Sequence, residues 1–207
     1  MEKNLFLQGD IAVGKSTLLR ETLLPHLQNI GGFFVQRVYK EKKHVAFRLS
    51  PLIDAESYRL NIGAGQLPEK ENLFLYSDED NRWHARLTIF EQKGAEYLRK
   101  SREEAKKIIL MDEIGGVELQ CPLFMQTVLQ ILDGPQPVLG VLKAPRNFKK
   151  MGSRLAKPES IKKDVDRNLA AIRKHPLNQL LTVNRKNYDS VKLKVEKFVE
   201  NALLQGK

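Results

Sequence analysis

The chain has 207 residues, 42% of them hydrophobic, with a formal net charge of +10 and one cysteine. This hydrophobic content is typical of a globular protein and excludes a disordered chain. A single cysteine, Cys121, excludes an internal disulfide, and the chain is long enough to fold without a structural metal. The longest apolar runs are far shorter than the roughly 20 residues of a membrane span, and we expect no secretory signal. We therefore expect one domain over residues 1–207 and a cytoplasmic location.

Apolar runs of strand length alternate with segments of helical periodicity, which is typical of an α/β domain. In chain order, the first half predicts a strand over residues 4–8, a helix over 15–28, a break at Gly31-Gly32, strands over 33–39 and 44–49, and a helix over 87–104. The second half predicts strands over 107–111, 138–142 and 179–183 that alternate with helices over 122–132, 161–174 and 190–204. This order predicts a mostly parallel central sheet flanked by helices, with a β-hairpin inserted after the first helix.

Two stretches lack a clear periodicity. Residues 50–82 contain prolines, glycines and an acidic run, which predicts irregular surface structure. Residues 143–163 are basic and are interrupted by proline and glycine, which predicts a mobile loop or lid. Four basic side chains there could close over phosphates, or could simply face solvent: Arg146, Lys149, Lys150 and Arg154.

The positive charge is concentrated in the last third of the chain. Residues 143–207 hold 17 basic and 6 acidic side chains, whereas the first 142 residues hold 18 and 19. Such a segment favours an anionic partner, namely nucleic acid, a membrane surface or a phosphate-rich small molecule. Solvated helix faces would give the same composition, so charge alone does not choose between these readings.

The stretch from Gly9 to Ser16 matches the pattern G-x-x-x-x-G-K-[ST], between a predicted strand and a predicted helix. Glycines let the backbone curl so that successive N–H groups face phosphate oxygens, and the helix adds its positive end. We expect Lys15 to reach the β- and γ-phosphates and Ser16 to bind Mg²⁺. The predicted nucleotide-binding residues are Gly9, Asp10, Ile11, Ala12, Val13, Gly14, Lys15, Ser16 and Thr17. This Walker A motif makes the predicted α/β domain a P-loop NTPase fold.

An acidic pair, Asp112-Glu113, follows the apolar run that begins at Ile108. Ligands of open α/β sheets bind at the carboxyl ends of the strands, so this Walker B-like pair is well placed for chemistry. We expect Asp112 to hold Mg²⁺ together with Ser16, and Glu113 to orient and deprotonate the attacking water. Phosphoryl transfer depends on positioning and charge neutralisation, so Glu113 and Lys15 are the predicted catalytic residues.

Other candidate residues carry weaker signals. The four histidines are scattered and lack the spacing of a metal site or a catalytic triad, which favours surface or packing roles. Trp83 is interpreted as a packing residue, with base stacking as the alternative. Cys121 has no neighbouring base in the sequence and is interpreted as structural.

Several motifs resemble those of the small nucleoside-triphosphatases that include the cancer-related nucleoside-triphosphatase and its prokaryotic relatives. The similar stretches are the one from Asn4 to Thr17, Gly32-Phe33-Phe34, and Met111-Asp-Glu-Ile-Gly115 followed by Glu118-Leu119. The resemblance implies magnesium-dependent hydrolysis of ATP, GTP and other nucleoside triphosphates with little base preference. Two departures stand out, because Gly116 replaces a lysine and Gln36-Arg37 replaces two glutamates.

The leading hypothesis is therefore a magnesium-dependent nucleoside-triphosphatase that releases the diphosphate and phosphate. One alternative is a nucleoside or nucleotide kinase, in which Glu113 would accept a proton from a substrate hydroxyl. A further alternative is a nucleotide-regulated RNA- or DNA-binding module that uses the basic segment, with affinity that falls steeply with salt. This third alternative ranks last because no nucleic-acid motif with interleaved aromatics is present. We expect no membrane partner, and we favour a monomer.

Overall fold

The computed structural model describes residues 2–66, 72–144 and 159–204, and residues 159–163 only as helical backbone. The strands are β1 (Asn4–Gly9), β2 (Ile30–Lys40), β3 (Lys43–Pro51), β4 (Asn61–Gly63), β5 (Leu73–Ser77), β6 (Trp83–Ala85), β7 (Ile108–Ile114), β8 (Val138–Leu142) and β9 (Asn178–Val183). The helices are α1 (Lys15–Leu23), α2 (Ala95–Glu103), α3 (Pro122–Asp133), α5 (Glu159–Arg173) and α6 (Tyr188–Leu204). Shorter 3₁₀ turns follow at Leu24–Asn29, Ala64–Gln66 and Val117–Gln120, and a π turn over Phe90–Gly94 leads into α2.

The described strands form one sheet with the order β6-β5-β3-β2-β7-β8-β1-β9, and β4 pairs with β2 beside this path. Strands β2, β7, β8, β1 and β9 run parallel, so their carboxyl ends share one edge. Strand β8 lies between β1 and β7, which separates the first glycine-rich loop from the acidic pair by one strand. The predicted fold class, a mostly parallel sheet with flanking helices, is confirmed.

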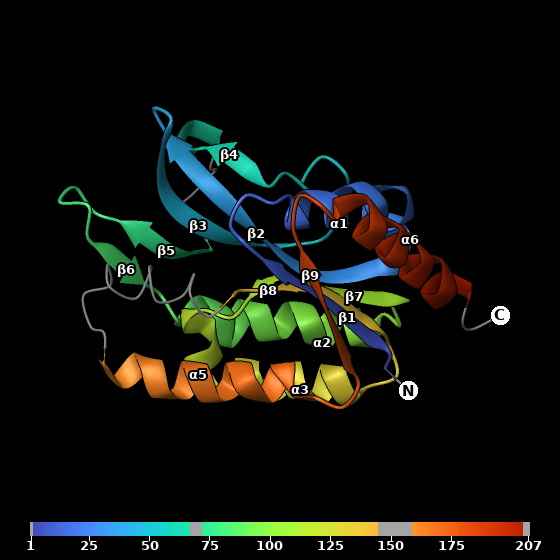
Figure 1. The fold of residues 1–207 in the computed structure, drawn as a ribbon. Helices are drawn as coiled ribbons and strands as arrows, with labels where there is room; N and C mark the ends of the chain where they lie inside the picture. Colours follow the sequence, from blue (N-terminus) through green and yellow to red (C-terminus); the bar gives the residue numbers. More distant parts are fainter. Residues whose placement is uncertain (1, 67–71, 145–158, 205–207) are drawn as a thin grey trace.

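Helices cover both faces of the parallel part of the sheet (Figure 1). One core cluster joins α1 and α6 to the sheet through leucines and valines such as Leu18 and Val195. The other joins α2, α3 and α5 to the opposite face, with Phe33, Phe90 and Phe124 in mutual aromatic contact. Because helices cover both faces of this part of the sheet, its strands must be apolar along their whole length. Strand β8, in which every residue is buried, is an example.

Three sequence predictions need correction. The Gly31-Gly32 pair does not break the chain but lies within β2, where its lack of side chains allows close packing against β7 and α2. Residues 50–82 are not wholly irregular, because they contain β4 and β5. The helix predicted over 15–28 ends at Leu23, and Pro25 explains why, since it has no N–H for the next helical hydrogen bond.

The two-stranded insertion after α1 is confirmed, and it extends further than expected. Strands β2 and β3 pair antiparallel around a turn at Glu41-Lys42. Strands β5 and β6 continue this antiparallel extension, and Trp83 of β6 packs on the ring of Phe47 with centroids 5.9 Å apart. This contact agrees with the interpretation of Trp83 as a packing residue.

The sequence predicts a basic lid that begins at Lys143, but the structure places Lys143 at the end of the core. Its backbone N–H donates to the Ile114 carbonyl at 2.8 Å, and its own carbonyl accepts from the Arg173 guanidinium. Its side chain is buried. The other lid candidates, Arg146, Lys149, Lys150 and Arg154, lie outside the described residues.

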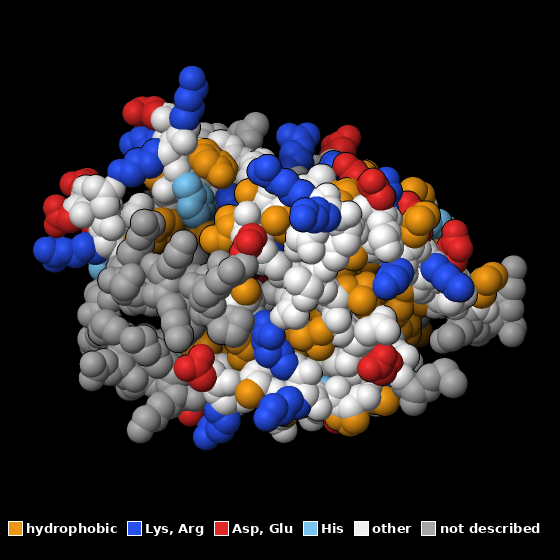
Figure 2. Space-filling model, in the orientation of Figure 1, with side chains coloured by type: hydrophobic (Ala, Val, Ile, Leu, Met, Phe, Trp, Pro, Cys, Tyr) orange, Lys and Arg blue, Asp and Glu red, His pale blue; other side chains and the backbone are white. Residues whose placement is uncertain are grey.

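Basic and acidic side chains are interspersed among the described residues of the face shown in Figure 2. That part of the surface therefore presents no continuous basic patch of the kind that nucleic-acid binding favours. Within residues 2–66, 72–144 and 159–204, no helix is both long enough and apolar enough to cross a bilayer.

Replacement of Gly32 should destabilise the fold strongly. Gly32 has φ 99°, and a Cβ there would lie far inside van der Waals distance of the Leu110 carbonyl on β7. We expect Gly32→Ala to lower the free energy of unfolding by about 2–4 kcal/mol, from backbone strain and overpacking together. Urea denaturation measures this loss.

Gly65→Ala is the matched control, because no atom of the described residues other than its chain neighbours lies within 4 Å of a Cβ built at Gly65. We expect its unfolding free energy to stay within about 0.5 kcal/mol of the parent. Equal stability of the Gly32 and Gly65 variants would contradict the close approach of β2 to β7.

Candidate active site

The loop between β1 and α1 has the conformation that its glycines permit. Gly9 (φ 147°) and Gly14 (φ 88°) both adopt positive φ values, which residues with a Cβ rarely do. Gly9 also lies directly against the Val183 carbonyl of β9, which leaves no room for a side chain. Helix α1 begins at Lys15, so its free N–H groups point towards the space that the loop encloses.

Lys15 is buried, and its ammonium group lies within the curve of its own loop. Nζ donates to the Asp10 carbonyl at 2.6 Å and to the Gly9 carbonyl at 3.1 Å. Burial lowers the pKa of the ammonium group, and the carboxylates of Glu113 and Asp112 act in the opposite direction. The loop thus holds a cation that acidic groups face and that an arriving phosphate can attract away from the carbonyls.

Ser16 and Asp112 are in direct contact, although they are far apart in the sequence. The Ser16 hydroxyl donates to Asp112 Oδ1 at 2.9 Å. Burial raises the pKa of the Asp112 carboxyl to about 7, which the Ser16 hydrogen bond only partly offsets. The second oxygen, Oδ2, is buried and has no hydrogen-bond partner among the described residues.

This donor set fits Mg²⁺. The ion needs few protein ligands, because it keeps several waters and binds phosphate oxygens. A hydroxyl and a carboxylate with an unpartnered oxygen, both beside the loop, supply that kind of partial shell. The described residues contain no cluster of three or more His, Cys, Asp or Glu that could hold a metal without a nucleotide.

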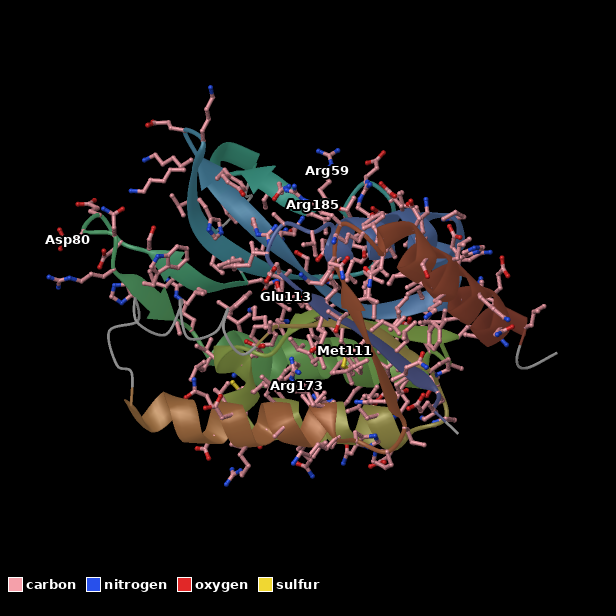
Figure 3. The ribbon with its side chains drawn as sticks, viewed as in Figure 1. Arg59, Asp80, Met111, Glu113, Arg173 and Arg185 are labelled. Carbon is pink, nitrogen blue, oxygen red and sulfur yellow. The ribbon has the colours of Figure 1, made fainter. Side chains whose placement is uncertain are left out.

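Glu113 lines a pocket of about 280 Å³ that opens beside the loop. Figure 3 shows Glu113 near the centre of the molecule, between the layer of β2 and β4 and the layer of α2, α3 and α5. Its side chain is half-buried, and within the described part of the chain its carboxylate has no hydrogen bond or ion pair. It is therefore free to accept a hydrogen bond from a water in the pocket.

The pocket brings together most of the residues that the sequence predicts. Its lining includes Ile11, Ala12, Gly14, Lys15, Ser16, Thr17 and Glu113. Four predicted residues do not line it. They are Gly9, which packs on β9, Asp10, Val13, and Asp112, which is buried and bonded to Ser16. Sequence reasoning missed Arg37, Leu60, Asn61 and Val141, which complete the wall.

The glycine at position 116 has a structural explanation. Its N–H, like that of Gly115, donates to Glu118 Oε1 at 2.6 Å. A Cβ at Gly116 would lie 2.8 Å from Glu118 Oε2 and 3.1 Å from Lys143 Nζ. The buried Glu118 and Lys143 therefore occupy the space that a longer side chain at this position would need.

Sequence comparison places these features in a known family. A model of the NTPase family matches residues 4–196, from the first residue of β1 into α6. The chain belongs to the NTPase family. The cancer-related nucleoside-triphosphatase homolog of Mus musculus is 30% identical over 189 residues, which cover 87% of this chain and 94% of that protein. Nucleoside-triphosphatase THEP1 of Thermofilum pendens is 28% identical over 144 residues, which cover 68% and 73%.

Two solved structures share the fold of this NTPase-family chain. The crystal structure of THEP1 from Aquifex aeolicus has a TM-score of 0.62 at 20% identity, with 95% of this chain and 99% of that chain covered. The solution structure of a human cancer-related nucleoside triphosphatase has a TM-score of 0.59 at 19% identity, with 96% and 98% covered. These similarities confirm the P-loop NTPase fold that the sequence predicts.

The histidines and the cysteine lie away from the pocket. His84 and His175 pair with Asp78 and Asp133, at 2.6 and 3.1 Å. Cys121 is buried at the start of α3, and its Sγ contacts the Leu87 carbonyl at 3.4 Å. Burial raises the pKa of this thiol to about 12, and the nearby Glu91 and Glu118 act in the same direction. These contacts agree with the structural interpretation of Cys121.

Native Cys121 should therefore react very slowly with thiol reagents. At pH 8 we expect reaction with Ellman's reagent at least about 100-fold slower than in the denatured chain, because the raised pKa and burial both suppress the thiolate. Because Cys121 is the one cysteine in the sequence, the colour change reports this site alone. Similar rates in the native and denatured chains would contradict the buried, protonated thiol.

Proposed function

We propose that this chain hydrolyses nucleoside triphosphates, including ATP and GTP, to the diphosphate and inorganic phosphate in a magnesium-dependent reaction. The Ser16–Asp112 contact at 2.9 Å, where Ser16 lines the same pocket as Glu113, is the observation that carries the proposal. It brings the two motifs of a phosphoryl-transfer site together across β8. The names of the relatives, which describe nucleoside-triphosphatases, support the same activity.

In the proposed reaction, the backbone N–H groups of the loop bind the phosphates, and Lys15 exchanges its carbonyl partners for phosphate oxygens. Ser16 and Asp112, with Asp112 in its ionised form, would hold Mg²⁺. When bound, the ion would supply positive charge that neutralises the negative charge developing on the phosphates. These groups fix the triphosphate with its γ-phosphorus towards Glu113.

Glu113 then positions the nucleophile. Its carboxylate accepts a hydrogen bond from a water and takes a proton as the water oxygen bonds to the γ-phosphorus. The bond from the γ-phosphorus to the bridging oxygen breaks, and its electron pair stays on the diphosphate. The role requires only a correctly placed carboxylate, since positioning supplies much of the rate.

Phosphate release from a panel of nucleoside triphosphates tests the proposal. With Mg²⁺ we expect phosphate from ATP, GTP and pyrimidine triphosphates, and with EDTA we expect none. The same reactions with added nucleosides and nucleoside monophosphates test the kinase alternative. Faster ATP consumption together with a phosphorylated acceptor would replace the hydrolase by a kinase, and salt-sensitive RNA or DNA binding without turnover would favour a binding module.

A further inference from the structure

Arg37 reaches the nucleotide pocket from a strand that carries neither sequence motif. Within β2, Phe34 pairs with Asp112 of β7, and Arg37 comes three residues further along the parallel direction. At about 3.3 Å per residue, it lies roughly 10 Å beyond the level of Asp112 and just past the end of β7 at Ile114. Its backbone is fixed there, because its N–H donates to the Leu60 carbonyl at 2.8 Å and it pairs with Asn61 of β4.

The side chain of Arg37 lines the same pocket as Lys15, Ser16, Thr17 and Glu113. It is half-buried, and among the described residues its guanidinium has no hydrogen bond or ion pair. Among the described residues, some partly buried guanidinium groups do have partners, although that of Arg99 also has none. Arg48 donates to the Gln36 side chain, and Arg173 donates to a backbone carbonyl.

A half-buried guanidinium without a partner is unfavourable unless an anion completes the site. The other lining residues of the pocket include the phosphate-binding loop, whose free N–H groups favour an anion, so the anion expected beside Arg37 is a phosphate.

We propose that Arg37 binds the γ-phosphate of the bound nucleoside triphosphate and stabilises the negative charge that builds up as the bond to the diphosphate breaks. This inference rests on the proposed hydrolysis and deepens it. The planar guanidinium can donate two parallel hydrogen bonds to phosphate oxygens, which a lysine cannot do. Arg37 on β2 therefore supplies this arginine, and an arginine from residues 145–158 is not required for this role.

The test compares Arg37→Ala and Arg37→Lys with Arg59→Ala. Arg59, labelled in Figure 3, is an exposed arginine outside the pocket lining. It precedes Leu60, whose carbonyl accepts the backbone hydrogen bond of Arg37, so its loss removes the same charge close by. We expect Arg37→Ala to lower kcat roughly 100- to 1000-fold, as the loss of a transition-state donor does elsewhere. We expect Arg37→Lys to recover only a small part, and Arg59→Ala to stay within about threefold of the parent.

Equilibrium binding of an ATP analogue and of ADP tests the contact of Arg37 with the γ-phosphate independently of whether the chain hydrolyses ATP. The parent should prefer a non-hydrolysable ATP analogue over ADP, and Arg37→Ala should lose about 10-fold or more of that preference while ADP affinity is unchanged. Thermal unfolding midpoints check that each variant is folded. An unchanged kcat and an unchanged analogue preference in folded Arg37→Ala would overturn the role of Arg37, even where the parent hydrolyses ATP. If the parent released no phosphate, the proposed hydrolysis would fail, and the binding preference would still decide whether Arg37 contacts the γ-phosphate.

Discussion

Glu113→Gln should bind nucleoside triphosphates as the parent does and lose most of its hydrolysis, by about 100- to 10,000-fold in kcat. The amide keeps the size of the side chain and can still contact a water, but it cannot accept the proton. Affinity should hold, because the phosphate-binding loop and the Ser16–Asp112 pair are untouched. Single-turnover phosphate release, measured beside equilibrium binding of a non-hydrolysable analogue, separates the two effects.

Glu96→Gln is a suitable control for this variant. Glu96 is an exposed carboxylate on α2 that pairs with Lys93. Its loss removes the same charge away from the pocket and should leave kcat unchanged. Hydrolysis by Glu113→Gln at the parent rate would show that another group directs the water.

Lys15→Ala should weaken triphosphate binding by roughly 10- to 150-fold, which is the usual range for the loss of hydrogen bonds to a charged group. Hydrolysis should fall with it, because Lys15 also neutralises charge on the transferred group. The folded state should tolerate the change for two reasons. Burial lowers the pKa of the ammonium group, which shows that the interior does not favour its charge, and its hydrogen bonds within the described residues go to carbonyls of its own loop. Titration calorimetry with a non-hydrolysable analogue and Mg²⁺ gives the affinity, and thermal unfolding without ligand gives the stability.

Lys42→Ala provides the matched lysine control. Lys42 lies in the exposed turn between β2 and β3, far from the loop in sequence and outside the pocket lining. Its removal should change affinity by less than about twofold. Unchanged affinity in Lys15→Ala would contradict the assignment of the loop to phosphate binding.

The parts of the fold that the sequence predicts well are those with a strong local signal. Strands such as β7 and β8 are continuous apolar runs, and α3 has a clear apolar face bounded by Pro122 and Gly134. Strands β4 and β6 have three residues each, too few for a periodic pattern to appear. Their pairing depends on partners distant in the sequence, which local patterns do not identify.

The same distinction explains the site. Each of the two motifs lies at the carboxyl end of its own strand, the acidic pair within the last residues of β7, so the sequence alone reveals Lys15, Ser16, Asp112 and Glu113. Arg37 belongs to the inserted hairpin, and it enters the pocket only because β2 pairs with β7 and runs beyond it. Sheet order is not visible in a single sequence, so Arg37 appears there only as a departure from the pattern of related proteins.

Several predictions stay open to experiment. The single domain over residues 1–207, the lid role of residues 143–163 beyond Lys143, the cytoplasmic location and the monomeric state are still predictions. The proposal for Arg37 sharpens the lid prediction, because it expects Arg146 and Arg154 to be dispensable for the stabilisation of the γ-phosphate. Replacing these two arginines by alanine would show whether residues 145–158 contribute a second cation.

The path of the attacking oxygen tests the central claim most directly. ATP hydrolysis by the parent chain with Mg²⁺ in water enriched in heavy oxygen, followed by mass spectrometry of both products, shows which phosphorus the water attacks. Attack on the γ-phosphorus from the Glu113 side predicts heavy oxygen in the released phosphate, none in ADP, and labelled phosphate from Glu113→Gln formed at least about 100-fold more slowly. Heavy oxygen in ADP or AMP, or equally fast labelled phosphate from Glu113→Gln, would contradict it.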